Sequence, residues 1–197
     1  MNELIDGSEK SLQIFLKNLP GVDQVGAESR SAMLATRSIK TSSKAAAIDL
    51  AIRMVDLTTL EGADTPGKIR SLCAKAVRPD PSDLTVPHVG AICVYNDMVK
   101  IARSTLDEIG GKSIPVAAVS TAFPSGRASM EVKKRDTEDA ITAGASEIDM
   151  VIDRGAFLSG RIGEVFEEIK TIKQICGARA KLKVILETGE LVTYDNV

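Results

Sequence analysis

Hydrophobic residues along this chain fall into two alternating patterns from residue 51 onward. Short runs rich in Val and Ile have the length of buried strands, and they occupy residues 52–57, 91–95, 114–120, 147–153 and 181–187. The stretches between them place apolar residues at helical spacing, and they are residues 65–77, 96–111, 129–145 and 161–177. Strands that alternate with helices in this way predict βαβ units and a parallel sheet.

The beginning of the chain follows a different pattern. Residues 8–19 predict a short amphipathic helix, residues 20–30 a loop, and residues 37–52 a loop that leads into a second helix. A segment of this size cannot bury a core of its own. We therefore divide the chain into a helical N-terminal extension, residues 1–50, and an α/β domain, residues 51–197.

A dinucleotide-binding fold is disfavoured, because no G-x-G-x-x-G motif follows the first predicted strand. The remaining α/β architectures are a (β/α) barrel and a flavodoxin-like sheet. Residues 120–126 and 187–191 are Gly-containing segments that follow the third and fifth predicted strands. Barrel enzymes build their sites from such segments, at the carboxyl ends of the strands.

Composition narrows the range of functions. The 197 residues carry 25 Lys and Arg against 27 Asp and Glu, a formal charge of −2. This balance argues against a nucleic-acid-binding protein, since phosphate-backbone binding needs clustered positive charge. No apolar run reaches the roughly 18 residues that span a bilayer, and the acidic start is unlike a secretory signal. We expect a cytoplasmic protein with no membrane and no nucleic-acid partner.

Three cysteines and one histidine offer few metal ligands. Cys73, Cys93 and Cys176 lie far apart, so neither a disulfide framework nor a CxxC metal site is indicated. Cys93 lies within the second predicted strand, where we expect a small core residue because no base is visible beside it. His88, ahead of the same strand, is expected on the surface. No metal and no cofactor is expected.

Two predicted strands carry charged residues where a helix-covered parallel strand is normally apolar. A period of two places Glu147 and Asp149 on the face away from the helices, and in the fifth strand it places Lys183 there. If these strands are neighbours, Asp149 and Lys183 lie roughly 5 Å apart, one strand spacing. Such a carboxylate and ammonium can pass a proton through a substrate or water. A structural ion pair is the alternative.

Asp56 in the first predicted strand has the same unusual setting. It lies too early in the sequence to cap the helix that starts near Thr65. The charged run at residues 131–140, in contrast, predicts a solvated helix face.

Five segments of the chain together resemble the deoxyribose-phosphate aldolase family. They are MVDLTTLEGADT, AICVYN, VAAVSTAFPSGR, AGASEIDMVIDRGAFLSG and LKVILETGEL, in the family's order and spacing within residues 50–197. The combination of DLTTL, an FPxG loop, an EIDMV-type strand and ETGEL makes the resemblance specific. The helical extension resembles that of the longer family members.

The resemblance implies a TIM (β/α)8 barrel and a class I aldolase, a lyase of carbohydrate degradation and deoxyribonucleotide catabolism. Such an enzyme cleaves 2-deoxy-D-ribose 5-phosphate to acetaldehyde and D-glyceraldehyde 3-phosphate through a lysine Schiff base, without metal or cofactor. By position, Asp149 matches the proton-relay aspartate and Lys183 a pocket lysine beside the reactive one. Asp56 and Cys93 match pocket residues near the substrate.

One departure from the family pattern is large. The family's Schiff-base lysine lies on the sixth strand, in a string of the type F-I-K-T-S-T-G, which does not occur here. The second lysine on the seventh strand and the Gly-rich phosphate loops are also missing. We therefore expect an incomplete barrel of about five βα units, the N-terminal portion of an aldolase, with its Schiff-base lysine beyond residue 197.

Alternative functions follow from that departure. The chain could be a catalytically inactive fragment or binding module, whose open fifth strand pairs with another chain, and a homo-oligomer is one such assembly. Lys183 could itself form the imine. A transaldolase-like barrel is a further alternative, against which the DLTTL and ETGEL strings argue.

Overall fold

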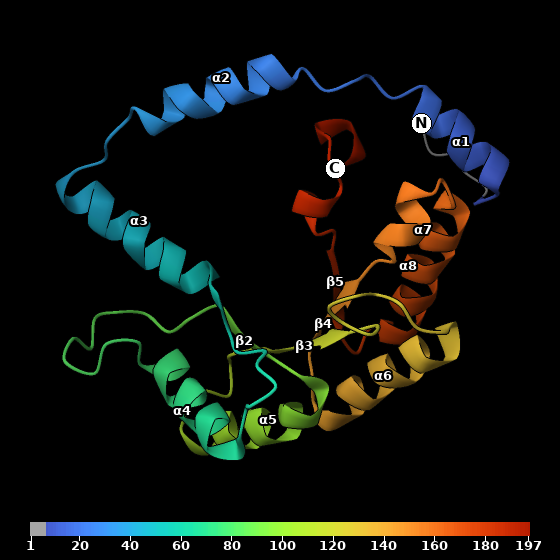
Figure 1. Cartoon of the computed structure of the whole chain (residues 1–197). Coiled ribbons are helices and arrows are strands. Elements are labelled where there is room, and N and C mark those ends of the chain that lie inside the picture. The colour runs from blue at the N-terminus through green and yellow to red at the C-terminus, as the bar shows by residue number, and fades with distance from the viewer. Residues whose placement is uncertain (1–6) are drawn as a thin grey trace.

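The computed structural model describes residues 7–197 and contains one five-stranded sheet (Figure 1). The strands are β1 (Asp56–Thr58), β2 (Ala91–Val94), β3 (Val116–Ser120), β4 (Glu147–Val151) and β5 (Lys181–Ile185). They lie in the order β1-β2-β3-β4-β5, and every neighbouring pair is parallel. The predicted parallel α/β sheet is thereby confirmed.

Four helices connect the strands and cover one face of the sheet (Figure 1). They are α4 (Pro66–Val77), α5 (Val99–Glu108), α6 (Met130–Ala143) and α8 (Ile162–Cys176). Local signals set their ends: the Thr65 hydroxyl accepts the Lys68 amide at 3.3 Å, and Gly144 ends α6 with φ of 111°. Shorter elements fill the connections, namely η1 (Asn96–Met98), α7 (Arg154–Leu158), η2 (Thr188–Glu190) and η3 (Tyr194–Asn196).

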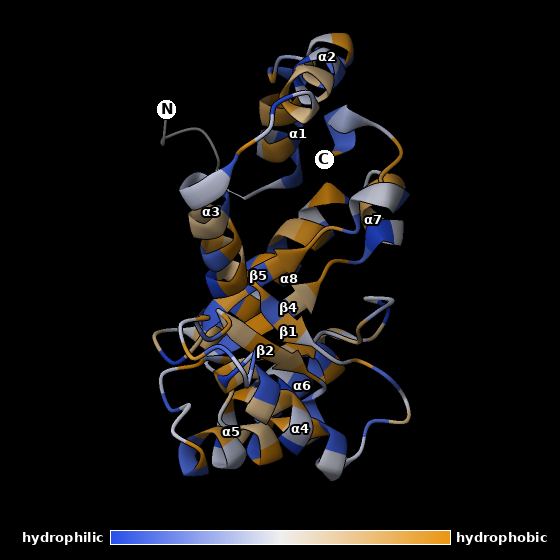
Figure 2. Ribbon diagram, turned by 90° about the vertical axis from the view of Figure 1, so that its left-hand side faces the viewer, coloured by the Kyte–Doolittle hydropathy of each residue, from blue (hydrophilic) through white to orange (hydrophobic). Residues whose placement is uncertain are grey.

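Side chains alternate between two environments along the strands. Toward the helices, the strands contribute Ile92, Val94, Val116, Ile148 and Met150 to a buried core that includes Cys73 and Cys176. Toward the opposite face they contribute a smaller cluster, Cys93, Ala117 and Val119. Figure 2 shows hydrophobic colour gathered on the central strands and hydrophilic colour on the outer loops. The face away from the helices is therefore where polar chemistry can be built.

The sheet is strongly curved. Lys183 on β5 forms an ion pair with Asp56 on β1, although these strands stand at opposite edges of the sheet. In a flat sheet, four strand spacings would separate the two strands by about 19 Å. Lys183 and Asp56 therefore meet across the concave interior, as expected of an incomplete barrel.

The helical extension forms an arch above this concave face (Figure 1). Its helices are α1 (Glu9–Lys17), α2 (Gln24–Ala35) and α3 (Thr41–Met54). α1 lies against α8, where the Glu9 carboxylate accepts the Gly163 amide at 2.7 Å. Neither α2 nor α3 contains a buried residue.

Two predictions for this part of the chain are wrong. Most of the predicted loop at residues 20–30 belongs to α2, because the Asp23 carboxylate caps the helix through the Gly26 amide at 2.9 Å. The first strand is also shorter than the predicted 52–57, since α3 continues to Met54. Among the described residues, none of the helices is both long and apolar enough to cross a membrane.

Candidate active site

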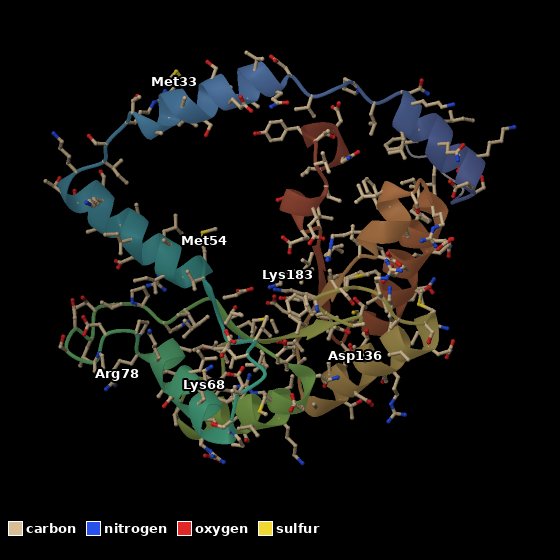
Figure 3. The ribbon with its side chains drawn as sticks, in the orientation of Figure 1. Met33, Met54, Lys68, Arg78, Asp136 and Lys183 are labelled. Atoms are coloured by element: carbon tan, nitrogen blue, oxygen red, sulfur yellow. The ribbon has the colours of Figure 1, made fainter. Side chains whose placement is uncertain are left out.

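Lys183 lies at the centre of a charged cluster on the concave face (Figure 3). Its ammonium contacts Asp56 on β1 and lies 3.2 Å from Asp149 Oδ2 and 3.5 Å from Glu147 Oε2 on β4. Asp149 and Lys183 are direct neighbours in the register of β4 and β5. The predicted proximity of Asp149 and Lys183 is confirmed, and one cation is surrounded by three carboxylates.

Asp149 is the most enclosed member of this cluster. Only 7% of the residue is exposed. Its Oδ2 atom accepts a weak hydrogen bond from the Cys93 thiol at 3.6 Å and contacts Lys183. Its Oδ1 atom is the one buried side-chain N or O atom among residues 7–197 without a hydrogen-bond partner. That oxygen is enclosed in the interior and keeps an unused capacity to accept a hydrogen bond.

Burial raises the pKa of Asp149 above its ordinary value. The Lys183 ammonium opposes this effect by stabilising the carboxylate, while the negative charge of Asp56 adds to it. A carboxyl whose proton affinity is increased in this way can both accept and return a proton near neutral pH more readily than an exposed aspartate.

The pKa of Lys183 is also raised. Burial would favour its neutral amine, but hydrogen bonds and charge from Asp56 and Asp149 outweigh that effect. An imine-forming lysine needs a neutral amine, so its pKa has to be lowered. The cluster therefore favours the charged form of Lys183 and disfavours the alternative in which Lys183 forms the imine.

Cys93 is a buried neighbour of the cluster, in a setting that disfavours its thiolate. Burial and the adjacent Asp149 carboxylate raise the pKa of its thiol to about 12. The residue packs with Ala117 and Val119, and Phe123 lies against the same group. The Phe123 ring meets Tyr95 edge to face, with 6.5 Å between ring centroids. These side chains form an apolar wall beside the charges.

The other sequence candidates lie elsewhere. His88 is exposed, with Nδ1 2.7 Å from the Val89 carbonyl. Within residues 7–197, no group of three His, Cys, Asp or Glu side chains could hold a metal ion. The predicted solvated face at residues 131–140 is wrong in one respect, because Lys133 is buried and lies 2.5 Å from Glu168.

Two polar residues make contacts that the sequence does not predict. Glu147 shares the face of Asp149, as the period of two indicates, but its contact with Lys183 depends on the register of β4 and β5. Arg154 joins the loops after β3 and β5, through the Pro124 carbonyl and Glu190. No sequence signal marks Arg154, since those partners are distant along the chain.

The parallel sheet is curved, helices cover its convex face, and a lysine–carboxylate cluster lies inside. These features define the class of (β/α)-barrel enzymes. Residues 50–195 match the sequence profile of the DeoC/LacD family aldolases, so the chain belongs to that family. This confirms the family resemblance and the fold class of an incomplete TIM barrel.

Relatives of known name support this assignment. Human deoxyribose-phosphate aldolase is 38% identical over 171 residues, which are 83% of this chain and 53% of the human protein. The mouse deoxyribose-phosphate aldolase matches with the same identity and the same shares. The chain thus spans about half the length of the curated relatives it matches.

Solved structures show the same fold. A Coccidioides immitis protein described provisionally as a deoxyribose-phosphate aldolase is 28% identical with a TM-score of 0.64, over 76% of this chain and 53% of that protein. The deoxyribose phosphate aldolase of Aeropyrum pernix, described as a unique tetramer, is 25% identical with a TM-score of 0.56, over 72% and 53% of the two chains.

Proposed function

We propose that this chain supplies the proton-transfer part of a deoxyribose-phosphate aldolase site, for the reversible cleavage of 2-deoxy-D-ribose 5-phosphate to D-glyceraldehyde 3-phosphate and acetaldehyde. The observation that carries the proposal is the buried Asp149, with a raised pKa and an unpartnered oxygen beside a charged lysine. The family membership and the names of the relatives supply the substrate class.

Asp149 is the proposed proton carrier. When the substrate aldehyde is held as an imine, the C2–C3 bond breaks as the C3 hydroxyl loses a proton, and the resulting enamine is later protonated at C2. Both transfers need a group that takes and returns a proton within the interior. The free Oδ1 atom of Asp149 can accept from the substrate or from one intervening water, while Oδ2 stays on Lys183.

Lys183 is the proposed electrostatic partner. Its charge stabilises the Asp149 carboxylate, and Asp56 holds the ammonium from the opposite edge of the sheet. The imine-forming lysine is proposed to come from a strand outside the five described ones. By the same resemblance, we propose that the whole enzyme acts in deoxyribonucleotide catabolism in the cytoplasm.

A binding module without catalysis is the second candidate function. The observation that favours it is the cluster itself, since three carboxylates keep Lys183 protonated and leave this cluster without a neutral amine. In that case the 197 residues bind the sugar phosphate without forming an imine.

A chimera tests the proposal directly. The 171 residues of the human aldolase that match this chain are replaced by those of this chain, and cleavage of 2-deoxyribose 5-phosphate is measured. We expect activity, and a loss of kcat of about a hundredfold or more with Asp149→Asn, the usual contribution of general acid–base catalysis. Asp139→Asn, on the exposed face of α6, is the matched control. Full activity of the Asp149→Asn chimera would contradict the proposed role.

Borohydride trapping tests the remaining alternative, in which Lys183 itself forms the imine. The 197-residue chain is incubated with 2-deoxyribose 5-phosphate and sodium borohydride, and its intact mass and peptide map are recorded. We expect no adduct on Lys183, because the ammonium cannot attack the aldehyde. An adduct on Lys183 would make this chain an imine-forming enzyme in its own right.

A further inference from the structure

Arg154 connects three loops at the carboxyl end of the sheet. It is the first residue of α7, which follows β4 after Ile152 and Asp153, and its side chain is only 14% exposed. Its Nη1 atom donates to the Pro124 carbonyl of the loop after β3 at 3.1 Å, and its Nε atom pairs with Glu190 in η2, after β5. One guanidinium therefore joins the loops after β3 and β5.

The base of Arg154 is fixed by a buried polar network. The Asp153 carboxylate caps α7 through the Ala156 amide at 2.9 Å. The Asp153 amide donates to Glu168 Oε2 at 3.4 Å, while Glu168 Oε1 lies 2.5 Å from Lys133. Because α6 and α8 hold this pair in place, the backbone that carries Arg154 has little freedom to move.

The loop after β3 rests on the end of β4. The Thr121 hydroxyl accepts the Val151 amide and donates to the Val151 carbonyl, both at 2.9 Å. A Cβ atom on Gly126 would lie 2.4 Å from the Ile152 carbonyl oxygen, so only glycine permits this approach. Between these two anchors, the bond from Arg154 to Pro124 holds the tip of the loop.

This loop also carries a wall of the site. Phe123 precedes Pro124 and packs on the apolar cluster of Cys93, Ala117 and Val119, which lies beside Asp149. A shift of the loop tip therefore moves an aromatic side chain against the charged cluster. The position of Phe123 depends on the contact between Arg154 and Pro124.

We propose that Arg154 is a positioning residue, which holds the loops after β3 and β5 at a fixed separation and thereby sets the Phe123 wall of the sugar-phosphate pocket. The proposal rests on the function proposed above. A guanidinium suits this task because its planar fork donates in two directions at once, whereas an ammonium is a single point of charge.

Hydrogen–deuterium exchange of the full 197-residue chain tests the inference. In Arg154→Met, which keeps the length of the apolar stem, residues 121–126 and 187–190 are expected to exchange about tenfold faster, the effect of one lost hydrogen bond. Arg154→Lys should restore slow exchange in the segment at Glu190 but not in the loop at Pro124. Arg135→Met, which removes an exposed ion pair on α6, is the control and should leave both segments unchanged.

The affinity for 2-deoxyribose 5-phosphate is measured by NMR on the same variants. We expect several-fold weaker binding in Arg154→Met with an unchanged melting temperature, which a purely structural role would not produce. Equal exchange of both loops in Arg154→Met and the wild type would overturn the inference. Absence of binding by the wild type, together with faster loop exchange in Arg154→Met, would refute the second candidate function, in which the 197 residues bind the sugar phosphate on their own, and leave the loop clamp standing.

Discussion

At the scale of single residues, the interior of the sheet is electrostatically unbalanced. Three carboxylates, those of Asp56, Glu147 and Asp149, surround the one ammonium of Lys183. Carboxylates that are removed from water respond by taking up protons more readily, and the raised pKa of the most buried one, Asp149, is that response. Burial is thus the main cause of this shift, and the negative charge of Asp56 adds to it.

The thiols should be unreactive in the folded chain. Burial raises the pKa of Cys73 to about 11 and that of Cys93 to about 12, and it raises the pKa of Cys176 as well. Because the thiolate is the nucleophile, we expect negligible alkylation by iodoacetamide at neutral pH. Intact mass should show three additions only after denaturation. Rapid modification of Cys93 in the native chain would show that the cluster does not raise its pKa.

Asp64 should make the stability of the chain pH-dependent. Its carboxylate pairs with Lys68 at 2.6 Å and accepts the Thr59 hydroxyl at 2.9 Å, which fixes the loop after β1. The bond to Lys68, with help from Glu61 and Thr59, lowers the pKa of Asp64 below 3.8 despite some desolvation.

Because its pKa is lowered in the folded chain, Asp64 adds stability at pH values above its unfolded pKa of 3.8. That stability is lost as the pH falls through the pKa of the folded state. We therefore expect Asp64→Asn to lower the melting temperature at pH 6, with the difference from wild type shrinking as the pH falls below 4. Thermal melts of both proteins at pH values from 6 to below 4 measure this difference in melting temperature. A difference that stays constant with pH would mean that the charge of Asp64 does not contribute.

At the scale of secondary structure, the apolar pattern predicted the elements that bury a face. Residues 147–151 form the predicted strand because β4 is covered by helices and reads as apolar at every second position. The sequence does not predict the helix α2, for the opposite reason: none of its residues is buried, so no apolar stripe marks it. The apolar run at residues 52–55 predicts a strand, although most of it belongs to α3, because a short apolar run is compatible with both a strand and a helix.

The buried face of α6 was hidden by its polar composition. Lys133, Thr137 and Ala140 are its buried residues, at helical spacing. Lys133 is satisfied by Glu168 on α8, and the Thr137 hydroxyl lies 3.0 Å from that of Ser120. The spacing was visible in the sequence, but the partners of Lys133 and Thr137 come from other elements and could not be predicted.

The ion pair between α6 and α8 should show strong coupling. Lys133 and Glu168 are 4% and 3% exposed, so Lys133→Met leaves an unpaired buried carboxylate and should cost about 3–5 kcal/mol. The double variant Lys133→Met with Glu168→Leu should recover most of that loss, because it removes both charges. Urea unfolding of the two single variants and the double variant measures the coupling. Additive losses would show that the two charges act independently.

At the scale of the whole molecule, the sequence predicted which residues face the interior but not how far the sheet curves. The pairing of Asp149 with Lys183 follows from neighbouring strands. The contact between Asp56 and Lys183 joins the two edge strands, and it depends on the twist summed over all five. Sequence periodicity describes one strand at a time, so it carries no information on the total twist of the five strands.

The two open edges, β1 and β5, should make the 197-residue chain self-associate, because an unpaired strand edge is a template for another strand. The Thr59 amide donates to the Cys93 carbonyl of β2 at 3.1 Å, so the preceding amide, that of Thr58, points outward from the sheet. Thr58→Pro should therefore remove an edge donor without loss of the β1–β2 ladder, whereas Thr59→Pro should disrupt it.

Sedimentation velocity over rising micromolar concentrations measures this association, the range in which open edges pair. We expect the sedimentation coefficient of the wild type to increase with concentration and that of Thr58→Pro to increase less. Thr59→Pro, the neighbouring control, should instead lower the melting temperature, because it removes a hydrogen bond inside the sheet. A wild-type chain that stays monomeric at every concentration would show that its open edges are protected, and the curvature that brings Lys183 to Asp56 would then be the first cause to examine.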